Sequence, residues 1–74
     1  MINPAGLSFY SVPLLDAFKT FDGPKVEVHI TNIHKRESTY QKSLISMAAT
    51  GVIAGLGPLG YVLAIDAIEA AVSA

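Results

Sequence analysis

Residues 26–37 read VEVHITNIHKRE, and this stretch indicates how the rest of the chain is organised. Apolar and polar side chains alternate along its first half, in the order Val26, Glu27, Val28, His29, Ile30 and Thr31. Side chains of a β-strand point alternately to opposite faces of the sheet. The alternation therefore predicts a strand over residues 25–31 with one apolar face and one face that carries a carboxylate, an imidazole and a hydroxyl. Such a polar face is typical either of a functional site or of a half-exposed strand followed by a basic turn.

A helix is predicted on the N-terminal side of this strand. Ser11 is a favourable N-cap, Pro13 is tolerated in a first helical turn, and apolar residues recur at helical spacing as far as Phe21. The residues DGP at 22–24 then end the helix. Residues 1–3, ahead of the helix, resemble the last residues of a strand that runs into a turn.

Two further elements are predicted on the C-terminal side. A polar loop runs to about Ser43, and the apolar stretch TGVIA at 50–54 is typical of a short buried strand. A glycine-rich turn follows at 55–60, and a helix is expected from about Leu59 to Val72. The order of strand end, helix, strand, strand and helix favours an α/β fold with a parallel sheet and flanking helices. The sheet edge beside residues 1–3 would have no neighbour, so the chain is interpreted as half of a larger unit.

Length, charge and composition restrict the class of protein. The chain has 74 residues, which is enough for one small domain over residues 1–74. The net charge of -1 argues against a nucleic-acid partner, and the absence of cysteine is compatible with a reducing compartment. No basic residue precedes the first apolar stretch, so a signal peptide is not expected.

A small membrane protein is the most distant alternative. Residues 44–65 form an uncharged stretch of 22 positions, with basic residues before it and acidic residues after it. Three glycines and a proline between residues 55 and 60 would interrupt a spanning helix near its middle. We therefore expect no membrane partner.

The turn GLGPLG at 55–60 also matches the GxGxxG pattern of dinucleotide-binding proteins. That pattern requires a further strand with an acidic residue about 20 positions on, and only 14 residues follow Gly60. Pro58 also removes a backbone N–H from any phosphate cradle. A tight strand-to-helix turn without a nucleotide cofactor is the favoured interpretation. No cysteine or acidic cluster accompanies the two histidines, so no metal site is expected.

The polar face of the predicted strand is the strongest candidate site. Glu27 and His29 would share that face and form a hydrogen-bonded pair that fixes the imidazole tautomer, an arrangement that suits either a structural or a functional role. Ligands of open α/β sheets bind beyond the carboxyl ends of the strands. Thr31 and nearby backbone N–H groups, with a cation from Lys35-Arg36, predict a site for a small anionic ligand there.

Three stretches of the chain resemble a known enzyme family. INPAGLSFYSVPLLDAF, VEVHITNIHKRE and ATGVIAGLGPLGYVLAI are similar, in order and spacing, to the C-terminal half of type II 3-dehydroquinate dehydratases. The resemblance implies a flavodoxin-like fold, a cytoplasmic location and assembly into trimers that pack into dodecamers. It also implies dehydration of 3-dehydroquinate to 3-dehydroshikimate through an enolate, in the shikimate or quinate pathway, with no cofactor and no metal.

The resemblance assigns roles to residues of this chain. His29 corresponds to a histidine that hydrogen-bonds a ring hydroxyl, with Glu27 beside it. Ile30 and Thr31 correspond to the pair that holds the substrate carboxylate, although serine is usual at the second position. Asn3 corresponds to an asparagine that positions a water against the enolate oxygen.

Two further substrate contacts follow from the same resemblance. Arg36 corresponds to an arginine of the loop beside the active-site tyrosine. Asp16 corresponds to an aspartate that reaches into the site of a neighbouring subunit.

Departures from the family pattern put activity in doubt. The proton-donating histidine of the family falls on Phe9, which cannot transfer a proton. A glycine of the pattern falls on Ala5, and a substrate-binding arginine falls on Tyr40. The first half of the family pattern, which carries the tyrosine base, does not appear in this sequence.

Three kinds of protein are compatible with these departures. We expect a chain that is not competent alone, either as a pseudoenzyme or as one part of a split enzyme whose other half is a second chain. A non-catalytic assembly or carboxylate-binding module, forming a homo-oligomer, is the alternative.

Overall fold

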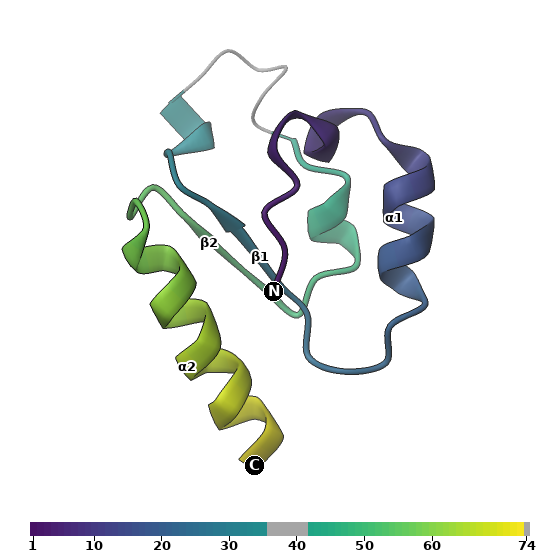
Figure 1. Ribbon diagram of the computed structural model, residues 1–74. Coiled ribbons are helices and arrows are strands. Elements are labelled where there is room, and N and C mark those ends of the chain that lie inside the picture. The colour runs from purple at the N-terminus through teal and green to yellow at the C-terminus, as the bar shows by residue number, and fades with distance from the viewer. Residues whose placement is uncertain (36–41, 74) are drawn as a thin grey trace.

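The computed structural model describes residues 1–35 and 42–73 (Figure 1). The strands are β1 (Val26–His29) and β2 (Gly51–Ala54), and the α-helices are α1 (Val12–Lys19) and α2 (Leu59–Ser73). Short 3-10 helices in the described part of the chain are η1 (Ala5–Phe9), η2 (Ile33–Lys35) and η4 (Ile45–Met47). The α/β class predicted from the sequence is confirmed.

β1 lies at the centre of a small parallel sheet. β2 pairs with one of its edges in the register Val26↔Gly51 to His29↔Ala54. Ile2 occupies the other edge, where its N–H donates to Val26 O at 2.9 Å and its carbonyl accepts from Val28 N–H at 2.7 Å. The predicted strand ending at residues 1–3 is therefore present as a single parallel bridge. This bridge brings Asn3 to the carboxyl end of β1.

β1 is shorter and more deeply buried than the sequence predicted. It ends at His29 rather than at residue 31, and all four of its residues are buried. The polar face of Glu27 and His29 is thus not half-exposed, because other parts of the chain cover it. β2 differs in the opposite sense: it was predicted to be buried, but Val52 is 45% exposed.

α1 begins where the sequence predicted. The Ser11 hydroxyl accepts a hydrogen bond from Leu14 N–H at 3.2 Å, and Pro13 lies in the first turn. The helix ends at Lys19 instead of Phe21 because the backbone N–H groups of Thr20 and Phe21 bond to carbonyls three residues back. Phe21 therefore leaves the apolar face of the helix and is 58% exposed.

α2 packs directly on the sheet. Figure 1 shows α2 on one side of the two strands and α1 on the other. Val26, Val28 and Ala64 form a buried cluster, and Tyr61 packs against it. A Cβ at Gly60 would lie 3.1 Å from Val28 Cγ1, so the absence of a side chain there permits this close approach.

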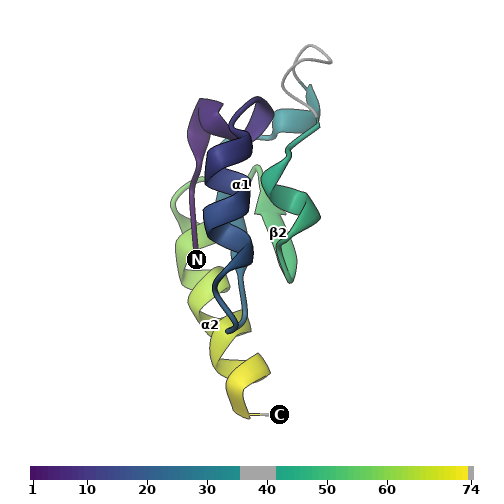
Figure 2. The ribbon, with the colours of Figure 1, turned by 90° about the vertical axis from the view of Figure 1, so that its right-hand side faces the viewer.

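The chain forms a thin slab, which Figure 2 shows from its narrow side. Its principal extents are 37 × 27 × 14 Å. A slab of this thickness covers few residues completely, and several large apolar side chains of α2 are exposed: Leu59, Val62, Ile65 and Val72. Large apolar side chains exposed together along one helix are typical of a region that contacts another polypeptide.

The glycine-rich turn between β2 and α2 matches the predicted strand-to-helix connection. Gly55 and Gly57 both have positive φ angles, 89° and 63°, which glycine adopts without strain. Gly55 N–H donates to His29 O at 3.1 Å, and Gly57 N–H donates to Ile30 O at 2.9 Å. These N–H groups support the end of β1, so they are not available to a phosphate group.

Residues 44–65, which were considered as a membrane span, are divided among η4, β2 and the first half of α2. Among the described residues, every helix is too short or too polar to cross a bilayer.

Candidate functional site

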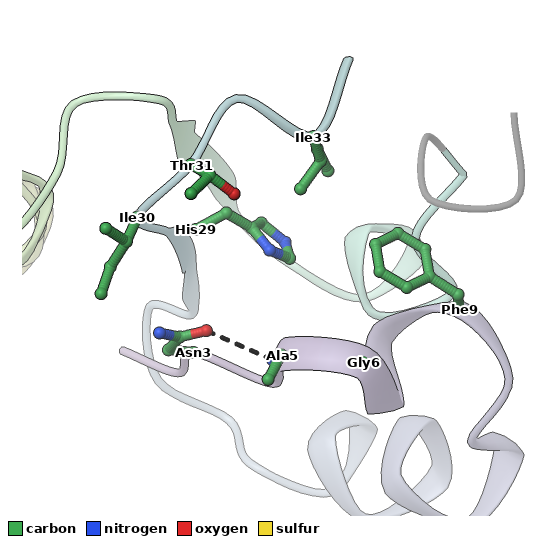
Figure 3. Close-up of a pocket in the computed structure, with 8 residues that line it drawn as sticks. All are labelled: Asn3, Ala5, Gly6, Phe9, His29, Ile30, Thr31 and Ile33. Carbon is green, nitrogen blue, oxygen red and sulfur yellow. Dashed lines mark hydrogen bonds between the residues drawn. The ribbon is translucent and has the colours of Figure 1, made fainter. Parts of the chain in front are cut away.

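A cavity of about 210 Å³ lies at the carboxyl end of β1 (Figure 3). Asn3 and η1 form one wall, and the end of β1 with the residues that follow forms the other. The residues that line it are Asn3, Ala5, Gly6, Phe9, His29, Ile30, Thr31 and Ile33. Sequence analysis had singled out Asn3, His29, Ile30 and Thr31, and the fold brings these four together around one cavity.

Glu27 and His29 form the buried polar centre of the site. The side chain of Glu27 is fully buried and His29 is 4% exposed. His29 Nε2–H donates to Glu27 Oε2, and the Ser46 hydroxyl donates to Glu27 Oε1 at 2.5 Å. Because a carboxylate oxygen only accepts hydrogen bonds, Nε2 carries a proton. In the neutral ring Nδ1 is then an acceptor, and it is the ring nitrogen that a ligand in the cavity can use.

The side chain of Asn3 is held at both ends. Its Nδ2 donates to the Tyr61 hydroxyl at 2.7 Å, and its Oδ1 accepts from Ala5 N–H at 3.2 Å. These two bonds define which end of the amide is oxygen and which is nitrogen. The Asn3 side chain therefore has a fixed orientation at the edge of the cavity.

η1 closes the cavity opposite the strand. Ala5 begins it with φ at 52°, in the left-handed region that glycine adopts more easily. The Ser8 hydroxyl donates to Ala5 O at 2.7 Å, and the buried Ser8 carbonyl accepts from Leu44 N–H at 2.6 Å. These bonds fix η1 so that Phe9, its last residue, faces His29 with 6.4 Å between ring centroids and 31° between the ring planes.

Ile30 and Thr31 lie at the rim, directly after β1. Gly57 N–H holds the Ile30 carbonyl from the side of the glycine-rich turn. The Asn32 side chain begins η2 by accepting from His34 N–H at 3.0 Å. The backbone on either side of Thr31 is thus held by hydrogen bonds, to the glycine-rich turn at Ile30 and within η2 at Asn32.

The remaining predicted residues are not among the described residues that line the cavity. Asp16 lies on α1, exposed and away from the cavity lining. Arg36, predicted to contact the ligand, lies outside the described residues, as does Tyr40. Among the lining residues of the described ranges there is no lysine or arginine, so the predicted cation has no counterpart in that part of the chain.

Sequence reasoning missed two side chains that hold the site. Ser46 is 19 positions from Glu27, and Tyr61 is 58 positions from Asn3. Neither residue belongs to the periodic pattern of β1, and the family resemblance assigned no role to either. The contact map of the fold is needed to find them.

Comparison with known proteins supports the resemblance found in the sequence. Residues 1–69 match the family model for dehydroquinase class II. The chain is 49% identical over 69 residues to 3-dehydroquinate dehydratase 1 of Agrobacterium fabrum, covering 93% of this chain and 48% of the relative. It is 48% identical over 68 residues to a 3-dehydroquinate dehydratase of Clostridium botulinum, covering 92% of this chain and 46% of that relative.

A solved structure shows the same fold. The type II dehydroquinase of Propionibacterium acnes superposes with a TM-score of 0.90 at 43% identity, over 93% of this chain and 51% of that one. This similarity confirms the flavodoxin-like α/β fold class. The chain spans about half the length of the curated relatives it matches. From sequence and structure together, the chain belongs to the class II dehydroquinase family.

Proposed function

We propose that residues 1–74 form one partial dehydroquinase domain that binds a cyclic polyhydroxy carboxylate of the 3-dehydroquinate type. The observation that carries this proposal is the cavity at the end of β1, where Asn3, His29, Ile30 and Thr31 meet. The family resemblance assigns each of these residues to the substrate. His29 would accept a hydrogen bond from a ring hydroxyl, and Ile30 with Thr31 would hold the carboxylate. No cofactor and no metal enter this proposal.

Arg36 and Asp16 are further substrate contacts in this proposal. Arg36 would supply the cation for the carboxylate. Asp16 would act in the site of a neighbouring subunit, for which its exposure on α1 is suitable.

We propose further that this chain does not complete the dehydration by itself. Among the described lining residues, His29 is the only one with an acidic or basic side chain. Phe9 occupies the position of the family's proton donor and offers the cavity a phenyl ring. General acid catalysis requires a group that can transfer a proton within hydrogen-bond reach of the leaving hydroxyl.

A partner polypeptide is the third part of the proposal. The exposed apolar side chains of α2 and the outer edge at Ile2 are surfaces on which a further segment of the fold can pack. Either a second chain supplies the first half of the family fold, or copies of this chain assemble as a homo-oligomer. We place the assembly in the cytoplasm.

The test combines an activity measurement with a binding measurement. We expect no dehydration of 3-dehydroquinate above the buffer rate at high protein concentration, and heat of binding on titration with quinate or shikimate. Turnover well above buffer would contradict the proposed incompetence. The absence of heat at millimolar ligand would contradict the binding site.

A non-catalytic carboxylate-binding module is the second candidate. The observation that favours it is Phe9, because a phenyl ring beside His29 adds apolar contact to a cavity while removing the proton transfer. Native mass spectrometry separates the candidates. A 7.8 kDa chain bound to a second, unlike polypeptide indicates a split enzyme, whereas a chain bound only to its own copies indicates the module.

A further inference from the structure

The fully buried carboxylate of Glu27 has one hydrogen-bond donor on each oxygen. His29 Nε2–H bonds to Oε2, and the Ser46 hydroxyl bonds to Oε1 at 2.5 Å. Burying a carboxylate without hydrogen-bond partners costs free energy. The Glu27 carboxylate is therefore held in the position where both of its oxygens have a donor. η4 supplies the second donor from a part of the chain that does not line the cavity.

Removal of the Ser46 hydroxyl would change what His29 presents to the cavity. Oε1 would lose its hydrogen bond, and the carboxylate would be free to rotate toward other donors. His29 would then lose the fixed acceptor that keeps its proton on Nε2. Since the tautomer of an imidazole is set by the partner of one ring nitrogen, the other nitrogen would no longer be reserved as an acceptor.

We propose that Ser46 is a positioning residue of this site. By fixing Glu27, the Ser46 hydroxyl keeps His29 in the tautomer whose Nδ1 accepts a hydrogen bond from a ligand hydroxyl. The identity of that ligand rests on the proposed function. The effect of Ser46 on the tautomer does not, because it depends only on contacts within the chain.

The matched substitutions are Ser46→Thr and Ser46→Val. Threonine and valine have nearly the same shape, so the pair differs by the presence of a hydroxyl at constant volume. Ser73→Ala, at the exposed end of α2, is the control for loss of a serine hydroxyl elsewhere. Backbone amide spectra of each variant establish that the fold is retained.

The first measurement is the nitrogen-15 chemical shift of the His29 ring, which distinguishes protonated from unprotonated nitrogens. His34, which is exposed on η2, serves as a reference in the same spectrum. We expect Nε2 protonation in the natural chain and in Ser46→Thr, both of which carry the hydroxyl, and a mixture of tautomers in Ser46→Val, which lacks it. An unchanged His29 signal in a folded Ser46→Val chain would overturn the proposal.

The second measurement is the affinity for quinate by calorimetric titration. We expect Ser46→Val to weaken binding roughly tenfold and Ser46→Thr to stay within about threefold of the natural chain. If quinate does not bind the natural chain but the tautomer shift is observed, the proposed function fails while the role of Ser46 in positioning His29 stands. Equal quinate affinity of the two variants, with binding intact, would contradict a role for Ser46 in the site.

Discussion

The side-chain amide of Asn3 donates a hydrogen bond of 2.7 Å to the hydroxyl of Tyr61, which links the segment before η1 to the first turns of α2. The Tyr61 ring packs against the core cluster of Val26, Val28 and Ala64. The anchor of the Asn3 side chain is therefore itself held by the core. This arrangement connects the packing of α2 to the orientation of a residue at the cavity.

Tyr61→Phe removes the hydroxyl and keeps the ring. We expect the free energy of unfolding to fall by less than about 1 kcal/mol, because the core contacts remain and the lost bond is exposed to water. Quinate affinity should fall severalfold, because the Asn3 amide is then free to turn. Tyr10→Phe makes the same chemical change at a side chain that is 70% exposed and should leave both quantities unchanged. Calorimetric titration and chemical denaturation measure the two effects, and an unaltered affinity would show that Asn3 does not depend on Tyr61.

Ala5→Gly should stabilise the chain. Ala5 has a φ of 52°, where a Cβ causes strain of about 1–2 kcal/mol. The added flexibility of the unfolded chain offsets part of the gain, so a net increase of about 0.5–1 kcal/mol in the free energy of unfolding is expected. Ala17→Gly, inside α1, should instead destabilise by about 1 kcal/mol. If denaturant titration shows losses for both variants, the left-handed conformation of Ala5 carries no strain.

The two glycines of the turn after β2 should respond differently to alanine. A Cβ at Gly55 would lie 3.0 Å from Asn32 Cβ and 3.3 Å from Asn32 Cα, in addition to the strain of its positive φ. A Cβ at Gly57 meets nothing within 4 Å, so only the strain applies. We expect Gly57→Ala to cost about 1 kcal/mol and Gly55→Ala clearly more. Thermal or denaturant unfolding of the pair decides this, and equal losses would contradict the close approach of Asn32.

Phe9→His tests whether the phenyl ring is the main obstacle to catalysis. The experiment uses this chain joined to the N-terminal half of the Agrobacterium fabrum relative, which supplies the part of the family fold that this chain does not match. We expect the substitution to raise dehydration of 3-dehydroquinate by about 10²–10⁴ over the unsubstituted chimera, the usual contribution of a general acid. Phe9→Leu in the same chimera should remain inactive. If the Phe9→His chimera shows no dehydration, the obstacle to catalysis is Tyr40 or the assembly instead of Phe9.

The elements of the fold were predictable where local chemistry determines them. Alternation identified β1, the Ser11 cap identified the start of α1, and glycine placement identified the turn before α2. The end of α1 was missed because backbone bonds over three residues tighten its last turn, and such bonds have no sequence signature. The burial of β1 on both faces was also missed, because segments distant in sequence, including η4, cover its polar face.

The site was predictable to the extent that its members are neighbours along β1. Glu27 and His29 are two positions apart on one strand, so their hydrogen bond follows from the strand period alone. Asn3 joined them only through the family resemblance, since a single bridge at Ile2 brings it there. Ser46 and Tyr61 reach the site across the fold, and no spacing rule relates them to their partners.

Because β1 lies at the centre of the sheet, the backbone hydrogen bonds on the two sides of the cavity open with different ease. Glu27 and His29 belong to a strand that has a hydrogen-bonded neighbour along both edges, and exchange of the amide hydrogens on its β2 side requires a large part of the chain to open. Asn3 follows a segment that Ile2 attaches by two backbone hydrogen bonds, and such an attachment can open while the rest of the sheet remains intact. The Glu27–His29 pair thus persists when the segment that carries Asn3 detaches. A ligand that contacts both Asn3 and His29 would therefore slow amide hydrogen exchange most strongly at residues 2 and 28, whose N–H groups form the two bonds of this attachment.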